Sequence, residues 1–321
     1  MTNTDLLTDR RRMRRKLSFW RITAALVTIA LVAGLALRFT GSGQGRDHIA
    51  RIDITGVITD DEELIGLIEG AAAAPAAKAI VISVSSPGGT TYGGEKIHKA
   101  LRDAAKAKPV VADIRTMAAS AGYMIAASAD HIVAGESSIV GSIGVLFQYV
   151  QAQELLDKVG VSLEEIKSSP MKAEPSPFHA PSEESKAMIR SMVLDSYDWF
   201  VDLVAEGRGM ERAEVLALAD GSVFTGRQAV GNGLVDAVGG EAEIRAYLKS
   251  RDVDASLDLV EWQRESRGTG LLFGRGAASL VERVVGAPVT LSQEIERLAG
   301  GKLFLDGLVS VWQFDRHAER D

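Results

Sequence analysis

Two serine-containing segments carry residue types that could support nucleophilic catalysis. The first, Ser85-Ser86-Pro87-Gly88-Gly89, follows an apolar run, and its glycines allow a sharp turn and close approach of a substrate carbonyl. Backbone N–H groups freed at such a turn suit a developing oxyanion. In the second, Met117 to Tyr123, Ser120 lies among small residues at the predicted start of a helix, near the positive end of its dipole. Taken singly, a structural turn and an N-cap serine explain the two segments better.

A serine nucleophile needs a general base, and histidine and lysine are the candidates. The histidines are dispersed along the chain: His48, His98, His131, His179 and His317. Of these, only His131, which follows Asp130, is retained as a candidate for a Ser-His-Asp triad. A lysine base must lose its proton near neutral pH from an ordinary pKa of about 10.4, which burial in apolar surroundings promotes. Lys167 and Lys172 share one proline-flanked segment. Lys172, between Met171 and Ala173, fits the role of a lysine base moderately. Nearby Glu174 would favour its charged form, and a solvated surface lysine is the simpler interpretation.

The remaining motifs and the composition narrow the function classes. The 321 residues are 25% charged and 46% hydrophobic, which excludes a disordered polymer and a multi-span membrane protein. The chain has no cysteine, so a disulfide framework and a cysteine nucleophile are excluded. The sequence contains no metal-binding HExxH motif and no phosphate-binding Walker loop. No dinucleotide-binding GxGxxG motif follows a predicted strand. Hydrolysis without a cofactor or metal is the chemistry that remains.

The elements that must position these residues alternate between strands and helices. Half-buried or β-branched runs predict strands at His48–Ile58, Ala79–Val84, Val110–Ile114 and His131–Ala134. Helices are predicted at Gly94–Lys106, Ala118–Ala127, Gln151–Val159 and Glu211–Ala219. Capping signals open three more: Thr59-Asp60-Asp61-Glu62 before a helix to Ala74, Ser182 before a long helix to Glu206, and Thr225-Gly226-Arg227-Gln228. This order predicts an α/β fold with a parallel sheet and right-handed crossovers.

Charge is distributed unevenly along the chain. Residues 1–40 hold eight basic and two acidic side chains, a net +6, so the total of −7 leaves −13 for residues 41–321. A part this acidic is a poor partner for nucleic acid. The uncharged stretch Ile22–Leu37 follows the basic cluster and predicts one transmembrane anchor over 22–38, short for a bilayer but extended by Trp20. A cleaved signal peptide and a buried core helix are the weaker alternatives.

The predicted organisation therefore has five parts. A basic cytoplasmic N-terminus (1–21) precedes the anchor (22–38) and a glycine-rich linker (39–47). The positive-inside rule places the following domain (48–255) outside the cytoplasm, at the inner membrane. The C-terminal extension (256–321), with an amphipathic piece at 277–285 and an apolar strand-like run at 303–312, would pack on the domain, on a neighbouring subunit or at the membrane.

The motifs, taken in order, resemble the signal peptide peptidase A family of membrane-anchored bacterial serine proteases. Any one motif is weak, but the ordered set is specific and spans about 190 residues, from His48 to Gly239. The matching segments are Ser85–Gly89, Met117–Tyr123, Gly141–Val145, Ile166–Lys172, Gly207–Met210, Asp220–Ala229 and Gly233–Asp236.

The resemblance implies a Clp-protease/crotonase-like fold and a Ser/Lys dyad. It assigns the nucleophile to Ser120, the general base to Lys172, and an oxyanion-binding N–H to Gly89, with Gly88 and Ser142 in supporting roles. It implies remnant signal peptides or other apolar peptides as substrate, no cofactor, and a ring-shaped homo-oligomer of single-domain chains. The 52 residues between the dyad partners do not say whether the dyad forms within or between chains.

Three other functions compete with this interpretation. A broader envelope quality-control endopeptidase would use the same dyad. A crotonase-like acyl-CoA enzyme would share the oxyanion-binding backbone but needs neither the Ser/Lys pair nor an anchor. An inactive membrane-anchored scaffold would need no catalytic residues, so the presence of both Ser120 and Lys172 argues against it.

Overall fold

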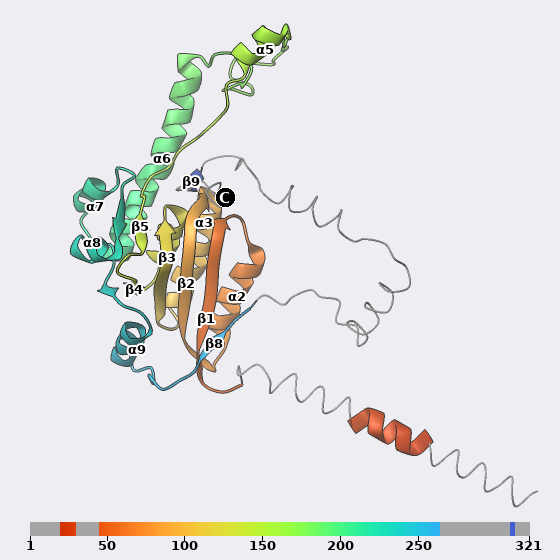
Figure 1. Ribbon diagram of the computed structural model, residues 1–321, viewed down its shortest axis with the longest axis vertical. Helices are drawn as coiled ribbons and strands as arrows, with labels where there is room; N and C mark the ends of the chain where they lie inside the picture. Colours follow the sequence, from red (N-terminus) through yellow and green to blue (C-terminus); the bar gives the residue numbers. More distant parts are fainter. Residues whose placement is uncertain (1–19, 30–44, 264–308, 312–321) are drawn as a thin grey trace, which may run out of the picture.

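The fold is a mixed β-sheet with helices on both faces (Figure 1). The computed structural model describes residues 20–29, 45–263 and 309–311. Its strands are β1 (His48–Ile58), β2 (Ala77–Thr90), β3 (Val110–Ala119), β4 (His131–Ala134), β5 (Ile139–Gly141), β6 (Val223–Thr225), β7 (Ala237–Val238), β8 (Leu259–Glu261) and β9 (Val309–Val311). Its labelled helices are α2 (Glu62–Ala73), α3 (Thr91–Ala105), α4 (Ala121–Ala126), α5 (Gln153–Val159), α6 (Glu183–Arg208), α7 (Arg212–Leu218), α8 (Gly226–Gly231) and α9 (Glu241–Ser250).

The centre of the sheet is parallel, as the alternation of strands and helices predicts. The main path runs β6-β5-β3-β2-β1-β8, with β4, β7 and β9 attached beside it. The pairs β1/β2, β2/β3, β3/β4 and β3/β5 are all parallel, whereas β2/β9 and β5/β6 are antiparallel. Long crossovers through helices join the successive parallel strands, as this geometry requires.

Alternate residues of the central strands enter two separate cores. On one face, Ile80 and Ile82 of β2 pack in the larger core, which also takes side chains from α2, α3, α4 and α6. On the other face, Val81 of β2 contacts a smaller core closed by Ile244 and Leu248 of α9. Burial on both faces explains why β2 begins as an almost continuous apolar run. Helix α9 itself is not among the sequence-based predictions.

Two strands are longer than predicted. β2 does not end at Val84 but continues through the glycine pair to Thr90, because its last residues still pair with β1 (Gly88 opposite Val57). β3 likewise continues to Ala119 because β5 pairs with its last residues. The helix predicted from Ala118 is therefore wrong at its start: α4 begins only after this extension.

Two of the three predicted helix caps are confirmed. Ser182 Oγ accepts a hydrogen bond from Ser185 N, and Thr225 forms a reciprocal capping box with Gln228. The third prediction, Thr59, is wrong, because the cap of α2 is Asp61, whose carboxylate accepts from Leu64 N at 3.0 Å.

Helix α6 extends well beyond the sheet. Its large buried side chains, Phe200, Val201, Leu203 and Val204, all lie near its C-terminal end. Its N-terminal half, together with α5 and the connecting segment 160–182, forms an arm that points away from the sheet (Figure 1). Phe200 follows Glu183 by 17 residues, which corresponds to about 25 Å of helix. We refer to residues 153–195 as the arm.

The predictions for the N-terminal anchor and the C-terminal extension fall only partly within the described residues. Residues 20–29 are helical, and the rest of the predicted anchor, 30–38, lies outside the described residues. Among the described residues, none of the helices combines the length and the apolar character that a membrane crossing requires. In the C-terminal extension, β9 lies within the strand-like run predicted at 303–312, whereas the amphipathic piece at 277–285 lies outside the described residues.

The fold should lose stability as the pH falls below about 6.5. Burial lowers the pKa of His98 and of His131 from the ordinary value of 6.5, so the folded state favours their neutral forms. Below 6.5 the unfolded chain binds protons that the folded chain does not, so the free energy of unfolding decreases. Urea unfolding between pH 7.5 and 5.5 should show this loss. The variant His98→Gln should show a shallower pH dependence, and an unchanged slope would contradict the assignment.

Candidate active site

Ser120 occupies a strained turn between β3 and α4. Its backbone has φ 56° and ψ −121°, a conformation that non-glycine residues rarely adopt and that costs about 1–3 kcal/mol. Two hydrogen bonds hold this strained conformation. Ser120 N donates to Gly141 O at 2.8 Å, and Met124 N donates to Ser120 O at 2.9 Å. The hydroxyl makes no capping bond to α4, so the N-cap role does not explain this serine. Such a strand-to-helix turn is a recurrent way to present a nucleophile.

The glycine turn of β2 lies beside Ser120. In the β2/β3 pairing, Ser86 is opposite Ala118, two residues before Ser120. Ser86 Oγ donates to Gly56 O at 2.7 Å and accepts from Gly88 N at 3.1 Å, which shapes the turn. A Cβ on Gly122, in the first turn of α4, would lie 2.8 Å from Ser86 O, so the two segments are in close contact.

Gly89 has no room for a side chain, because an added Cβ would overlap the backbone of Ile58 in β1. Gly88 has φ 107°, which favours glycine, and its N–H already binds Ser86 Oγ. Gly88 therefore supports the turn, and Gly89 follows it at the edge of the sheet where Ser120 lies. This arrangement agrees with the roles that the resemblance implies for the two glycines, and it leaves the oxyanion role of Gly89 a prediction.

Ser142 reaches the same edge from β5. It follows Gly141, whose carbonyl binds Ser120 N, and it has a positive φ of 53°. Its own N–H donates to Ser222 O at 2.7 Å. The structure thus has Gly88, Gly89, Ser120 and Ser142 at the same end of the sheet.

The structure does not bring Lys172 to Ser120 within one chain. Lys172 lies exposed on the arm, in a turn where its N–H donates to Ser169 O at 3.1 Å. The segment that carries it, 160–182, is at the end of α6 remote from the sheet (Figure 1). No hydrogen bond or ion pair of the Lys172 ammonium is found within the described part of the chain.

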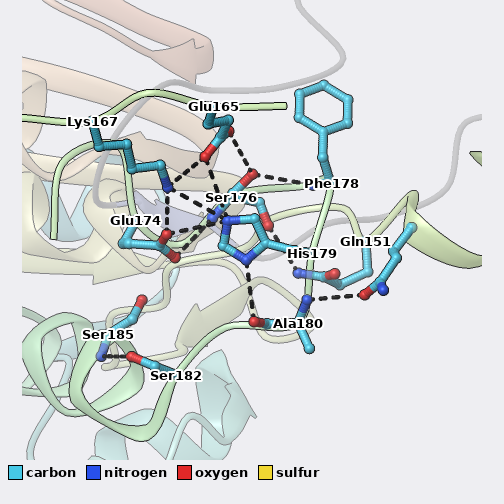
Figure 2. Close-up of polar contacts among 11 residues, drawn as sticks. Gln151, Glu165, Lys167, Glu174, Ser176, Phe178, His179, Ala180, Ser182 and Ser185 are labelled. Carbon is cyan, nitrogen blue, oxygen red and sulfur yellow. Dashed lines mark hydrogen bonds and ion pairs between the residues drawn. The ribbon is translucent and has the colours of Figure 1, made fainter. Parts of the chain in front are cut away.

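Lys167, the other lysine of this segment, is fully engaged by carboxylates (Figure 2). Its Nζ lies 2.6 Å from Glu165 Oε2 and 2.7 Å from Glu174 Oε1. The hydrogen bonds to Glu165 and then to Glu174 raise the pKa of Lys167. A lysine held charged in this way is a poor general base. The cluster of Lys167, Glu165, Glu174 and His179 is not predicted as a unit from sequence, although the close spacing of its charges is visible there.

His131 is excluded as the partner of Ser120 by its position. It pairs with Val111 at the start of β3, nine residues before Ser120, about 30 Å along an extended strand. His131 stacks on Tyr247 and lies 3.6 Å from Asp236, which also binds Arg208. These contacts tie β4 to α6 and α9 at the opposite end of the strand, so His131 and Ser120 do not form a triad within one chain.

The C-terminal strand β9 lies directly along the glycine turn. Gly88, Gly89 and Thr90 pair antiparallel with Val311, Ser310 and Val309, respectively. This edge of β2 therefore accepts an extended backbone immediately beside the candidate site.

Comparison with known proteins gives a consistent result. A family model for peptidase family S49 matches residues 102–255. A putative signal peptide peptidase SppA of Enterococcus faecium is 33% identical over 240 residues, covering 70% of each chain. A putative protease of Synechocystis, slr0021, is 36% identical over 67% of this chain and 80% of its own. The chloroplastic serine protease SPPA of Arabidopsis thaliana is 29% identical over 83% of this chain and 42% of its own.

A strained serine beside a glycine pair on an α/β sheet can serve as the nucleophile of a serine hydrolase. The chain belongs to peptidase family S49, among the signal peptide peptidase A proteases, and it is a serine peptidase.

The glycine turn gives a test that does not depend on substrate. Gly89→Ala should destabilise the fold by about 1–3 kcal/mol, because the new methyl group overlaps β1 and forces a backbone shift. Gly66→Ala is the matched control: it lies in α2 with open space around it and should stabilise the helix by about 0.5–1 kcal/mol. Urea unfolding measures both. Equal effects of the two substitutions would show that the turn is not closely packed.

Proposed function

We propose that the chain is a membrane-anchored endopeptidase that degrades remnant signal peptides with a Ser/Lys dyad. Ser120 is the nucleophile, Gly89 N–H binds the oxyanion and Lys172 is the general base. The observation that carries the proposal is the strained Ser120 turn, held against the glycine turn of β2 at one edge of the sheet. The family membership and the predicted anchor support the substrate class and the position outside the cytoplasm at the inner membrane.

The base comes from a neighbouring subunit. Within one chain, Lys172 is on the exposed arm, about 25 Å of helix away from the core, while Ser120 is buried at the sheet. A lysine base also needs surroundings that exclude water, and the arm of a single chain does not supply them. Docking of the arm on a second copy of the chain would meet both requirements.

The surface of the arm is suited to such a contact. Helix α5 has no buried residue, and large apolar side chains around it and the following segment are exposed. These are Val150, Leu155, Val159, Val161, Leu163 and Ile166. Large apolar side chains left exposed in such numbers on one segment favour an interface with another protein. Because every subunit carries both an arm and a Ser120 site, the contacts would be head-to-tail, and such contacts form a ring when the rotation between neighbouring subunits closes.

The substrate takes an extended conformation along β2. The edge formed by Gly88, Gly89 and Thr90 pairs with β9 in the structure, so its backbone can pair with an extended strand, and a substrate peptide would take the place of β9. Addition of a strand to a sheet edge is a common mode of peptide recognition. It would place a substrate carbonyl next to Ser120 and the Gly89 N–H.

The reaction is an acyl transfer in two steps. Neutral Lys172 accepts the proton of the Ser120 hydroxyl as its oxygen attacks the peptide carbonyl, and the lysine then protonates the leaving amine. An acyl ester of Ser120 remains. Lys172 next removes a proton from water, which attacks the ester, and it returns that proton to Ser120 as the carboxylic acid leaves.

Mixed oligomers test the origin of the base. Ser120→Ala and Lys172→Ala should each abolish cleavage of an apolar fluorogenic peptide, whereas Lys158→Ala, an exposed lysine of α5, should not. Co-assembly of the two inactive chains in equal amounts should restore about a quarter of the wild-type activity, because about one interface in four then pairs an intact serine with an intact lysine.

Two results would contradict the proposal. Full activity of Lys172→Ala would exclude this lysine as the base. Inactive mixtures, with exchange of subunits shown by differential labelling, would show that the dyad forms within one chain.

A further inference from the structure

Four ionisable side chains near Lys172 in the sequence form one cluster on the arm (Figure 2). They are Glu165, Lys167, Glu174 and His179. Lys167 lies at the centre, within 2.7 Å of both carboxylates, and the Glu174 side chain is only 7% exposed although the surrounding segment is largely open to solvent. A charge pair this enclosed, on a segment that is otherwise exposed, indicates a specific local role.

The cluster closes the turn that carries Lys172. The ion pair between Lys167 and Glu174 joins the two ends of the stretch 168–173, inside which Lys172 N donates to Ser169 O. The second oxygen of Glu174 accepts from Ser176 N at 3.3 Å, and Gln151 Nε2 donates to Ser176 O at 3.1 Å. The turn is thus fixed at its base and tied to the chain that enters α5.

The same ion pairs keep the Glu174 carboxylate from pairing with the Lys172 ammonium. Glu174 follows Lys172 by two residues, and a carboxylate within about 4–6 Å of a lysine stabilises its charged form. The described contacts of Glu174 are instead to Lys167, to Ser176 N and to His179 Nε2, 3.3 Å away. Glu165 is bound in the same way by Lys167, with His179 and Ser176 also facing it.

We propose that Lys167 is a positioning residue for the general base. Its ion pairs to Glu165 and Glu174 hold the turn that carries Lys172 and prevent both carboxylates from pairing with the Lys172 ammonium. This inference rests on the proposed function, in which Lys172 is the base. It explains why two lysines five residues apart have opposite surroundings, one between carboxylates and one with none.

The test is a set of substitutions in the full-length chain in detergent, with an apolar fluorogenic peptide. Lys167→Met should lower kcat at pH 7 on the order of tenfold, because the released carboxylates favour protonated Lys172. KM and the oligomeric state should not change, and activity should recover as the pH is raised. Lys167→Arg keeps both ion pairs and should stay near wild type. Lys186→Met, which removes the exposed Lys186–Glu183 pair elsewhere on the arm, is the matched control.

A triple variant separates this role from a general effect on folding. Combining Lys167→Met with Glu165→Gln and Glu174→Gln removes the released charges at almost constant shape, so kcat at pH 7 should rise well above that of Lys167→Met alone. A Lys167→Met enzyme with wild-type kcat at every pH would overturn the proposal. A loss that the triple variant does not relieve would also overturn it.

Hydrogen exchange provides a readout that needs no activity. In a Ser120→Ala background, Lys167→Met should speed amide exchange in residues 168–173, because the turn is no longer closed at its base. Unchanged exchange would overturn the positioning role even if Lys172 is the base. Conversely, wild-type activity of Lys172→Ala would refute the proposed function, whatever the exchange experiment shows about the turn.

Discussion

The parallel pairing of β2 with β3 is the constraint on which the sheet-borne part of the site depends. Because Ser86 is opposite Ala118, the glycine pair of β2 and Ser120 lie at the same end of the sheet. A shift of one residue in this pairing would turn every side chain of one strand to the other face and would separate the two segments. Burial of β2 on both faces fixes the register, so the large apolar core that stabilises the fold also sets the geometry of the turn.

Close backbone contacts complete this arrangement. Ser120 keeps a strained conformation because β5 binds its N–H and α4 binds its carbonyl. The contacts between α4, β2 and α3 are possible because Gly122 and Gly94 leave no side chain between the elements; a Cβ on Gly94 would lie 2.9 Å from the sulfur of Met124. The small residues around Ser120 therefore serve packing first, and the strained turn at Ser120 depends on that packing.

The sequence was most informative where local chemistry determines structure. The β-branched run before Ser86 predicts a covered strand, and Ser182 and Thr225 are confirmed as caps because their hydrogen bonds are local. It was least informative where partners distant in sequence extend an element. The continuation of β3 to Ala119 depends on β5, and the position of β9 depends on the edge of β2, neither of which a local pattern contains.

The site shows the same division. The resemblance implies roles for Ser120 and the glycines in one site, and the structure has them at one end of the sheet. No spacing could show that Lys172 lies on a projecting arm, since that depends on how much of α6 the core buries. On the proposed arrangement this separation has a functional consequence. A lysine in contact with water is protonated at neutral pH and cannot act as a base. An unassembled chain would therefore carry a serine without a base, so cleavage would begin only where subunits have met, and the cluster around Lys167 would keep the base-bearing turn formed until then.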